Sequence, residues 1–468
     1  MVFSTLTFLF AFFPLLFLLY FAGKNLTYKN TVLLIFSLIF YGWGEPKFIL
    51  LMLLATLIAY IGGLGIDRLD RSGKPKLRKT VFIVTVVLLV ANLFIFKYLN
   101  FAIDNINTLF GSSFVLQQIV LPIGISFYTF QILSYVIDLY MKEIKLQKNY
   151  FYLTLYVTFF PQLIAGPIVR YQTVEEEIHT RKETLEDITY GLRRFIIGLA
   201  KKVIIANNTG AIATLIYSGG TKVYGTQFYW LAAIAYALQI YFDFSGYSDM
   251  AIGLGRIFGF HFLENFNYPY IATSITDFWR RWHISLSTWF RDYIYIPLGG
   301  NRVKKYRWIF NICVVWALTG FWHGAQWNFL LWGLYYAILL LAEKLFLYKL
   351  LDKLPKIISW AYTFFLVLIG WVLFNLTDFQ QLSNALVHMF SFNFTAFGPT
   401  ITENLDILYA AIYIPLGILC MFPWVKKIKI KQSVTMDLII NIGCLLLLGI
   451  CIIYIIGSTY NPFIYFRF

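Results

Sequence analysis

Two histidines stand in polar segments of a chain that is otherwise very apolar. His283 lies in the stretch 276–292, which also holds two carboxylates, three arginines and three tryptophans. His323 follows 40 positions later, in the sequence Gly-Phe-Trp-His-Gly that spans 320–324. An ionised residue at the centre of a membrane helix costs about 2.5–3.5 kcal/mol on insertion scales. These two segments therefore predict chemistry or transport at membrane depth.

His323 has the properties expected of a general base. Glycines flank its segment, and small neighbours let a ligand or backbone approach closely. In apolar surroundings an imidazole is driven toward its neutral form, because desolvation penalises the charge. A neutral imidazole can take a proton from a hydroxyl group. A hydrogen-bonded core histidine is the alternative, and the sequence around it leaves both interpretations open.

The stretch 276–292, taken as one helix, separates two kinds of side chain. One stripe is aromatic and aliphatic, and the neighbouring face holds Arg280, His283 and Ser287. Asp277 precedes Arg281 by one turn, a spacing at which a carboxylate and a guanidinium can pair. The pattern predicts a polar face directed into a cavity. An interfacial helix with a belt of tryptophan and arginine fits the same spacing.

Composition sets the frame for these residues. The chain has 468 residues, of which 59% are hydrophobic and 13% charged, and a mean hydropathy of +0.69. We expect an all-α, polytopic membrane protein with about eleven to thirteen membrane helices, some short or re-entrant. We expect a single membrane-embedded domain over 1–468, in which 261–330 carries the active-site segments. The alternation of basic loops places both the N-terminus and 461–468 outside the cytosol.

Other protein classes fit the sequence less well. The net charge of +15 comes from short clusters between apolar runs, which suits lipid headgroups rather than nucleic acid. The four cysteines form no CxxC pair, and HExxH, GxSxG and phosphate-loop motifs do not occur, so we expect no metal site. The stretch 243–249 has an aspartate at each end, as in an ion-coupled transporter or a broken helix.

Longer motifs make the sequence resemble the membrane-bound O-acyltransferase superfamily, and within it the bacterial alginate O-acetyltransferase branch. The similarity runs through nearly the whole chain. In the first half of the chain the motifs lie at 1–4 (Met-Val-Phe-Ser), 40–46, 121–131 (beginning Leu-Pro-Ile-Gly-Ile-Ser-Phe) and 159–167 (Phe-Phe-Pro-Gln-Leu-Ile-Ala-Gly-Pro). In the second half they lie at 242–249 (Phe-Asp-Phe-Ser-Gly-Tyr-Ser-Asp), 264–270 (Glu-Asn-Phe-Asn-Tyr-Pro-Tyr), 280–283 (Arg-Arg-Trp-His) and 321–324 (Phe-Trp-His-Gly).

The resemblance implies a site and an architecture. His323 would be the catalytic residue and His283 the second polar residue of the active site, inside a ring of helices around a central funnel. Support for substrate binding is expected from six further residues, Arg280, Arg281, Asp277, Trp282, Trp322 and Asn328. The sequence departs from the family pattern at Asn375, where an arginine is expected, and at Tyr336, where a histidine is common.

The expected function is acyl transfer, most readily of acetyl, onto an extracytoplasmic polysaccharide or cell-wall glycan. The donor would be a cytosolic thioester, acetyl-CoA or an acyl carrier protein, with no bound cofactor. The resemblance also implies a separate extracytoplasmic SGNH-type transferase as partner, and a place in the inner membrane among its lipids. The alternatives are D-alanyl transfer to teichoic acid, a polysaccharide or ion transporter, and a non-catalytic scaffold of an export complex.

Overall fold

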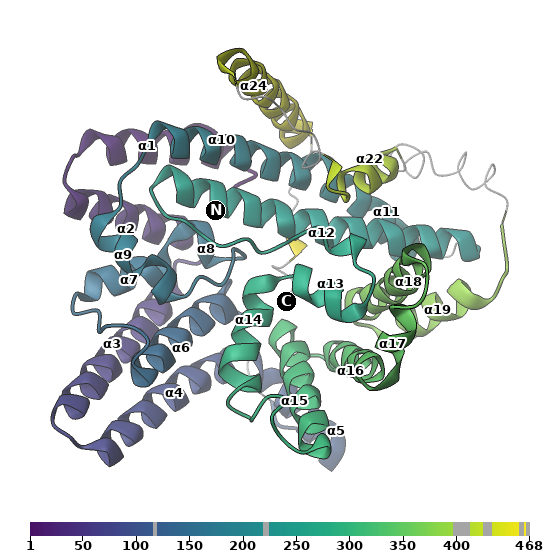
Figure 1. Cartoon of the computed structure of the whole chain (residues 1–468), viewed down its shortest axis with the longest axis horizontal. Helices are drawn as coiled ribbons and strands as arrows, with labels where there is room; N and C mark the ends of the chain where they lie inside the picture. Colours follow the sequence, from purple (N-terminus) through teal and green to yellow (C-terminus); the bar gives the residue numbers. More distant parts are fainter. Residues whose placement is uncertain (116–118, 219–223, 396–411, 425–432, 458–462, 465–468) are drawn as a thin grey trace. The chain divides into compact units, whose positions relative to one another are not determined.

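The computed structural model describes residues 1–115, 119–218, 224–395, 412–424, 433–457 and 463–464. Throughout these ranges the regular structure is helical, without a β-strand, as the sequence predicts (Figure 1). The chain divides into two compact units. The first comprises Met1–Phe195 and Met250–Leu263, and the second comprises Ile196–Asp249 and Glu264–Phe468.

The first unit contains the N-terminal helices. Its elements are the π-helical turn η1 (Phe8–Phe12), α1 (Phe13–Ala22), α2 (Leu26–Gly42), α3 (Ile49–Arg71), α4 (Pro75–Lys97), α5 (Leu99–Phe110), α6 (Ile125–Met141), α7 (Tyr150–Thr158), α8 (Phe160–Leu163), α9 (Tyr171–Thr180) and most of α10 (Leu185–Ala200).

The second unit carries both histidine segments. Its elements are η2 (Lys201–Ala206), α11 (Asn207–Ser218), most of α12 (Thr226–Ile257), the 3₁₀ turn η3 (Pro269–Ile271), α13 (Ile275–Arg281), α14 (Ile284–Phe290), η4 (Arg291–Tyr295), α15 (Lys305–His323), α16 (Trp327–Ala342), η5 (Glu343–Leu347), α17 (Tyr348–Leu351), α18 (Lys356–Asn375), α19 (Phe379–Phe390), α22 (Tyr413–Cys420) and α24 (Val434–Gly457). Here η2, η4 and η5 are π-helical turns.

Polar side chains mark where several helices begin. The first backbone N–H groups of a helix have no partner within it, and a side-chain oxygen at the N-cap accepts from one of them. Asn25 does this for α2, Asn149 for α7 and Asp378 for α19. Ser274 caps α13, where its hydroxyl oxygen accepts from the Asp277 N–H at 3.0 Å. The start of the histidine segment is thus set locally by the sequence.

Six helical stretches of the described residues are long and apolar enough to cross a membrane. They are Ile49–Arg71, Pro75–Lys97, Leu185–Ser218, Trp327–Leu351, Lys356–Asn375 and Val434–Gly457. Phe8–Ala22 and Leu26–Gly42 are apolar but shorter. The chain is therefore a multi-pass membrane protein, as predicted. The total of eleven to thirteen crossings stays a prediction, as do the single domain and the central funnel.

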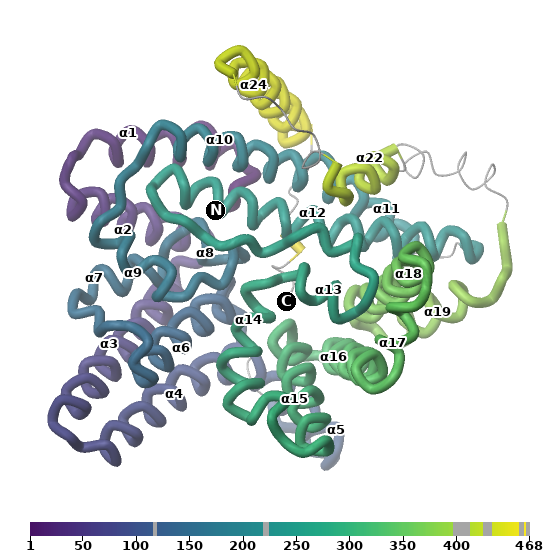
Figure 2. The backbone as a smooth tube through the Cα atoms, in the orientation of Figure 1, coloured from purple at the N-terminus to yellow at the C-terminus, as the bar shows by residue number. Residues whose placement is uncertain are grey.

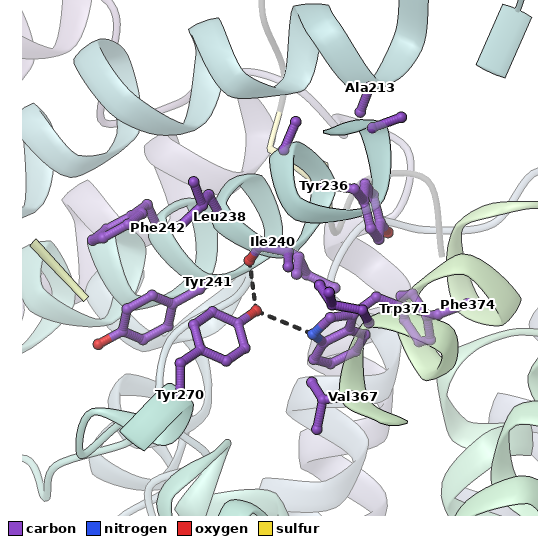
Figure 3. Packing of buried hydrophobic residues seen from close by; sticks show 14 of the residues in the cluster. Ala213, Tyr236, Leu238, Ile240, Tyr241, Phe242, Tyr270, Val367, Trp371 and Phe374 are labelled. Atoms are coloured by element: carbon purple, nitrogen blue, oxygen red, sulfur yellow. Dashed lines mark hydrogen bonds between the residues drawn. The ribbon is translucent and has the colours of Figure 1, made fainter. Parts of the chain in front are cut away.

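Aromatic side chains make up much of the core of the second unit. Tyr270 lies at its centre: its hydroxyl donates to the Ala237 carbonyl at 2.6 Å and accepts from the Trp371 indole N–H at 3.0 Å (Figure 3). Trp282 packs on Trp371, with ring centroids 4.7 Å apart. The polar atoms of Tyr270 and Trp371 are therefore satisfied where they support Trp282, the residue before His283.

Two expectations about local structure need correction. The stretch 276–292 is two helices, α13 and α14, followed by the turn η4, and the tube in Figure 2 shows α13 and α14 as separate helices. The stretch 243–249 is not a helix break, because it lies inside the continuous helix α12. Its two aspartates pair with lysines of η2: Asp243 with Lys202 at 2.5 Å and Asp249 with Lys201 at 2.6 Å.

Candidate active site

Both histidines line one cavity in the second unit. The cavity has a volume of about 170 Å³ and is lined by residues of α13, α14, η4 and α15 and of the segment between α13 and α14. Besides the histidines, its lining includes Trp279, Trp282, Trp316 and Arg291. The lining is mostly apolar and aromatic, with a few polar groups, as is common for small-molecule sites. The structure therefore brings His283 and His323 to a common site, as their predicted role requires.

His323 is the last residue of α15 and is buried among aromatic rings. Its ring centroid lies 5.1 Å from that of Trp332 and 5.0 Å from that of Phe374, both in nearly perpendicular orientation. These edge-to-face contacts restrict the orientation of the imidazole, because each ring excludes part of its rotation. The residue that would exchange protons is thus held by packing on α16 and α18.

Glycines bring α15 and α16 together at this point. A Cβ at Gly320 would clash with the Phe329 carbonyl oxygen, and a Cβ at Gly333 would clash with that of Trp316. Only glycine permits this approach of two helix backbones. The close contact places Trp332, which is on α16, against His323 on α15. The glycine in the motif at 320–324 thus has a packing role, one turn before the histidine.

His283 lies between α13 and α14 in an unusual backbone conformation. Its φ is 44° and its ψ 55°, in the left-handed region, where it forms the N-cap of α14. A non-glycine residue there carries strain and is worth attention as a functional position. The ring meets Phe244 of α12 edge-on, at a centroid distance of 4.5 Å. The bend turns the imidazole inward, and its side chain is 1% exposed.

Asn265 determines which nitrogen of His283 carries the proton. Its Oδ1 accepts from the Ser285 backbone N–H at 3.2 Å and from the Ser285 hydroxyl at 2.9 Å, so this atom is the amide oxygen. His283 Nδ1 lies 3.2 Å from the same oxygen and must therefore be the donor. In the neutral imidazole Nε2 then carries the lone pair and is the atom that can accept a proton.

Burial keeps His283 neutral. Desolvation lowers the pKa of the imidazole to about 3, from an ordinary value of 6.5. The residue lies outside the six membrane-crossing stretches, between α13 and α14. The cause of this shift is desolvation, which penalises the charged form of the ring. At neutral pH His283 can therefore act as a hydrogen-bonding group or base, but not as a resident cation.

The predicted supporting residues divide into two groups. Trp282 lines the cavity, and the Trp322 ring lies 5.9 Å from that of His283 and 5.0 Å from that of His323, so Trp322 contacts both. The charged residues of α13 do not line the cavity: Arg281 donates to Asp277 at 2.9 Å, and Arg280 is exposed. The arginine that does line it is Arg291.

Asn328 supports the site indirectly, through a neighbour of His323. Its Nδ2 donates to the carbonyl of Phe374 at 3.2 Å, and the Phe374 ring packs on His323. Asn328 thereby fixes the end of α18 beside the candidate base. Tyr336, one of the two departures from the family pattern, is fully buried and packs on Trp279 at 4.8 Å. It contributes to the wall behind the cavity.

Sequence reasoning missed Asn265 and Arg291 as site residues. Asn265 belongs to the motif at 264–270, which carries the family resemblance, and it precedes His283 by 18 positions. A contact across irregular backbone has no periodic signal in the sequence. In the described part of the chain no group of three or more histidine, cysteine, aspartate or glutamate side chains could hold a metal ion.

Comparison with known proteins decides the family. Residues 141–377 match the model of the membrane-bound O-acyltransferase family. The chain is also 43% identical over 398 residues to a probable alginate O-acetylase, AlgI, of Pseudomonas aeruginosa, covering 84% of this chain and 75% of that one. This chain belongs to the membrane-bound O-acyltransferase family. It is accordingly an O-acyltransferase, and both histidines of the cavity lie within the matched region.

Two further relatives of this membrane-bound O-acyltransferase have different named activities. A peptidoglycan O-acetyltransferase of Helicobacter pylori is 33% identical over 521 aligned residues, covering 100% of this chain and 98% of that protein. A teichoic acid D-alanyltransferase of Bacillus subtilis is 34% identical over 279 residues, covering 55% of this chain and 70% of that one. The likeness to the O-acetyltransferases thus extends over more of the chain.

Proposed function

We propose that this chain is a membrane O-acetyltransferase that supplies acetyl groups for the O-acetylation of an extracytoplasmic polysaccharide or cell-wall glycan. The observation that carries the proposal is the cavity in which His283 and His323 meet. The proposal is supported by relatives named as alginate O-acetylases and as a peptidoglycan O-acetyltransferase, which share most or all of the chain. D-alanyl transfer has weaker support, because that relative covers 55% of the chain.

The arrangement suggests how the transfer proceeds. An acceptor hydroxyl in the cavity gives its proton to His323 while its oxygen attacks the carbonyl carbon of an acetyl thioester. The new C–O bond forms as the C–S bond breaks, and the proton passes from His323 to the departing thiolate. The products are an acetyl ester and a free thiol, with no further reactant needed.

Other groups of the cavity would stabilise the charge on the carbonyl oxygen. The Trp279 side chain lines the cavity, and its indole N–H is buried and makes no hydrogen bond to another described residue. Arg291 also lines the cavity and pairs with Asp292 at 2.6 Å. Donors held in place before the reaction stabilise a developing oxyanion without reorganisation. Apolar walls strengthen this effect because they exclude water.

The donor and the partner follow from the same proposal. The donor is a cytosolic acetyl thioester, either acetyl-CoA or an acyl carrier protein. The chain acts in the bacterial inner membrane and hands the acetyl group to a separate SGNH-type transferase on the outer side, which modifies the glycan. Support comes from the resemblance to the alginate O-acetyltransferase branch and from the multi-pass character of the chain.

A deletion strain tests the proposal. Wild type, His323→Ala and a control, His388→Ala, are expressed in it, and glycan-bound acetyl is measured by mass spectrometry of wall and secreted polymers. His388 stacks on Tyr229 at 5.0 Å and does not line the cavity. Acetylation should fall by at least about 100-fold in His323→Ala and persist in the control, with equal protein in the membrane. Full acetylation by His323→Ala would refute the role of this residue.

A further inference from the structure

A buried carboxylate lies where α16 passes into the π-helical turn η5. Glu343 is the first residue of that turn and is 0% exposed. Its Oε1 accepts from the Ile275 N–H at 2.6 Å. Its Oε2 accepts from both the N–H and the hydroxyl of Thr276, each at 2.9 Å. All three donors belong to the first two residues of α13, so the carboxylate is bound to the start of that helix.

The chemistry at this contact is well matched. The first N–H groups of a helix lack partners within it and form the positive end of its dipole. A buried carboxylate is costly unless its charge is compensated and its oxygens accept hydrogen bonds. The N-cap Ser274 occupies the Asp277 N–H, and Glu343 occupies the N–H groups of Ile275 and Thr276. The N–H groups at the start of α13 thus gain an acceptor and the Glu343 carboxylate gains donors, and these hydrogen bonds fix α13 to η5.

The same contact joins the helix that leads to His283 and the element whose helix packs on His323. On one side, α13 presents Trp279 to the cavity and ends at Arg281, directly before Trp282 and His283. On the other side, η5 continues α16, whose Trp332 packs on His323. Glu343 lies outside the cavity lining and touches neither imidazole. Its effect on the site must therefore pass through the helices that it connects.

We propose that Glu343 is a positioning residue for acyl transfer, which holds α13 so that Trp279 and His283 face His323 across the cavity. The inference rests on the proposed function. It predicts a loss in the chemical step rather than in binding, because displacement of a reacting group by about 1 Å can cost about 100-fold in rate.

Glu343→Gln tests this with little change in size. A glutamine amide has one acceptor oxygen, whereas the carboxylate has two. Its NH₂ group must therefore face a donor, either the Ile275 N–H or the donors of Thr276, and cannot accept from it. Full-length protein in lipid nanodiscs is assayed with acetyl-CoA as the thioester probe, per mole of monodisperse enzyme. We expect kcat to fall by about 10- to 100-fold, with KM for acetyl-CoA unchanged within about twofold. A purely structural role would lower the yield of folded enzyme and leave kcat per folded molecule unchanged.

Asp378→Asn is the matched control. Asp378 is also a carboxylate at a helix N-terminus, where it accepts from the Gln381 N–H at 2.8 Å, but it caps α19 and is exposed. Its replacement should leave kcat unchanged. If the wild type is active and Glu343→Gln is equally active, the positioning role of Glu343 is overturned and the proposed function is unaffected. A wild type that does not turn over acetyl-CoA would overturn acetyl-CoA as the donor, and the same comparison of variants is then decided with an acetylated acyl carrier protein.

Thr276→Val gives a second measurement that leaves the carboxylate intact. It removes the hydroxyl donor to Glu343 and keeps the shape of the side chain. Thr276 acts through the same carboxylate. The double variant Thr276→Val with Glu343→Gln should therefore have the same kcat as Glu343→Gln alone, within about twofold. Losses that multiply would contradict the proposal. If Glu343→Gln fails to fold, kcat of Thr276→Val decides, and an unchanged value would overturn the inference.

Discussion

Asn265 gives the clearest case of a single side chain that sets the chemistry of another. Its amide oxygen receives Nδ1–H of His283, which leaves Nε2 as the accepting atom. A carboxylate in the same place would stabilise the imidazolium and raise the pKa of His283. Asn265→Asp should therefore move the acidic limb of the pH–rate profile to higher pH, because a protonated His283 has no lone pair. A limb at the wild-type pH would contradict the assigned tautomer.

His283 also predicts how stability depends on pH. Its pKa is about 3 in the folded protein and about 6.5 when exposed. Between these values the unfolded chain binds the additional proton, so stability rises with pH and is lost as pH falls from 6.5 toward 3. The slope from this residue is at most about 1.4 kcal/mol per pH unit.

Thermal unfolding in detergent can measure that slope. His283→Gln should flatten the loss of stability between pH 6.5 and pH 4, because a glutamine does not titrate. Equal slopes for the variant and the wild type would show that His283 is not buried as a neutral ring.

At this scale the sequence predicts some positions of the site and misses others. Residue type and neighbours identify His283, His323 and Trp322, all of which the structure brings together. The same reasoning assigns Arg280 and Arg281 to the site, but the first is exposed and the second pairs with Asp277. A charged residue beside a histidine in sequence need not face the same way, because the backbone bends between them.

The helix pair α15–α16 shows what close packing contributes at the scale of elements. A methyl group at Gly320 would meet the Phe329 carbonyl, which cannot move without displacing α16. Gly320→Ala should destabilise the protein by about 1–3 kcal/mol, as overpacking does, and reduce acetyl transfer. Gly443→Ala on α24 is the control, because no atom lies within 4 Å of the added Cβ. Similar melting temperatures for the two variants would show that the helices tolerate separation.

The segment around His283 shows where sequence patterns stop being informative about elements. Periodicity predicts a helix over 276–292, and helix is what most of the segment forms. The pattern continues through position 283, so it contains no sign of the left-handed residue that separates α13 from α14. The conformation is instead held by tertiary contacts, among them the bond from the Ile284 N–H to the Asn265 carbonyl at 2.9 Å.

Over the whole chain, residues far apart in sequence meet at a buried ion pair. Lys202 and Asp243 are 2.5 Å apart, and the Ile464 N–H donates to the same aspartate at 2.7 Å. Removal of one partner of a buried pair leaves an uncompensated charge and costs about 3–5 kcal/mol. Lys202→Met should therefore destabilise the protein strongly, and Lys202→Met with Asp243→Asn should recover part of the loss.

Detergent melting of the single and double variants measures this coupling. Loss of the exposed pair through Arg71→Met should cost at most about 1 kcal/mol and serves as the reference. A double variant less stable than either single one would contradict the expected compensation.

The fold class follows from composition because a chain this apolar must satisfy its backbone within helices. The sequence could not indicate how η2 meets α12. Lys201 and Lys202 pair with Asp249 and Asp243 of α12, and no periodicity in the sequence indicates which aspartates these lysines meet. The predicted placement of 461–468 lies outside the described residues, apart from 463–464.

The left-handed backbone at His283 bears on how mutagenesis of this site is interpreted. An alanine there removes the imidazole and also leaves a Cβ in a conformation that costs about 1–2 kcal/mol. The wild-type histidine bears the same cost, but an alanine lacks the ring contacts that help to hold this conformation, so its loss of function would combine a chemical and a conformational effect. Glycine removes the ring and relieves the backbone, while asparagine keeps a polar group and tolerates the same dihedral angles. A glycine–asparagine pair at this position therefore separates chemistry from conformation, which an alanine scan cannot do.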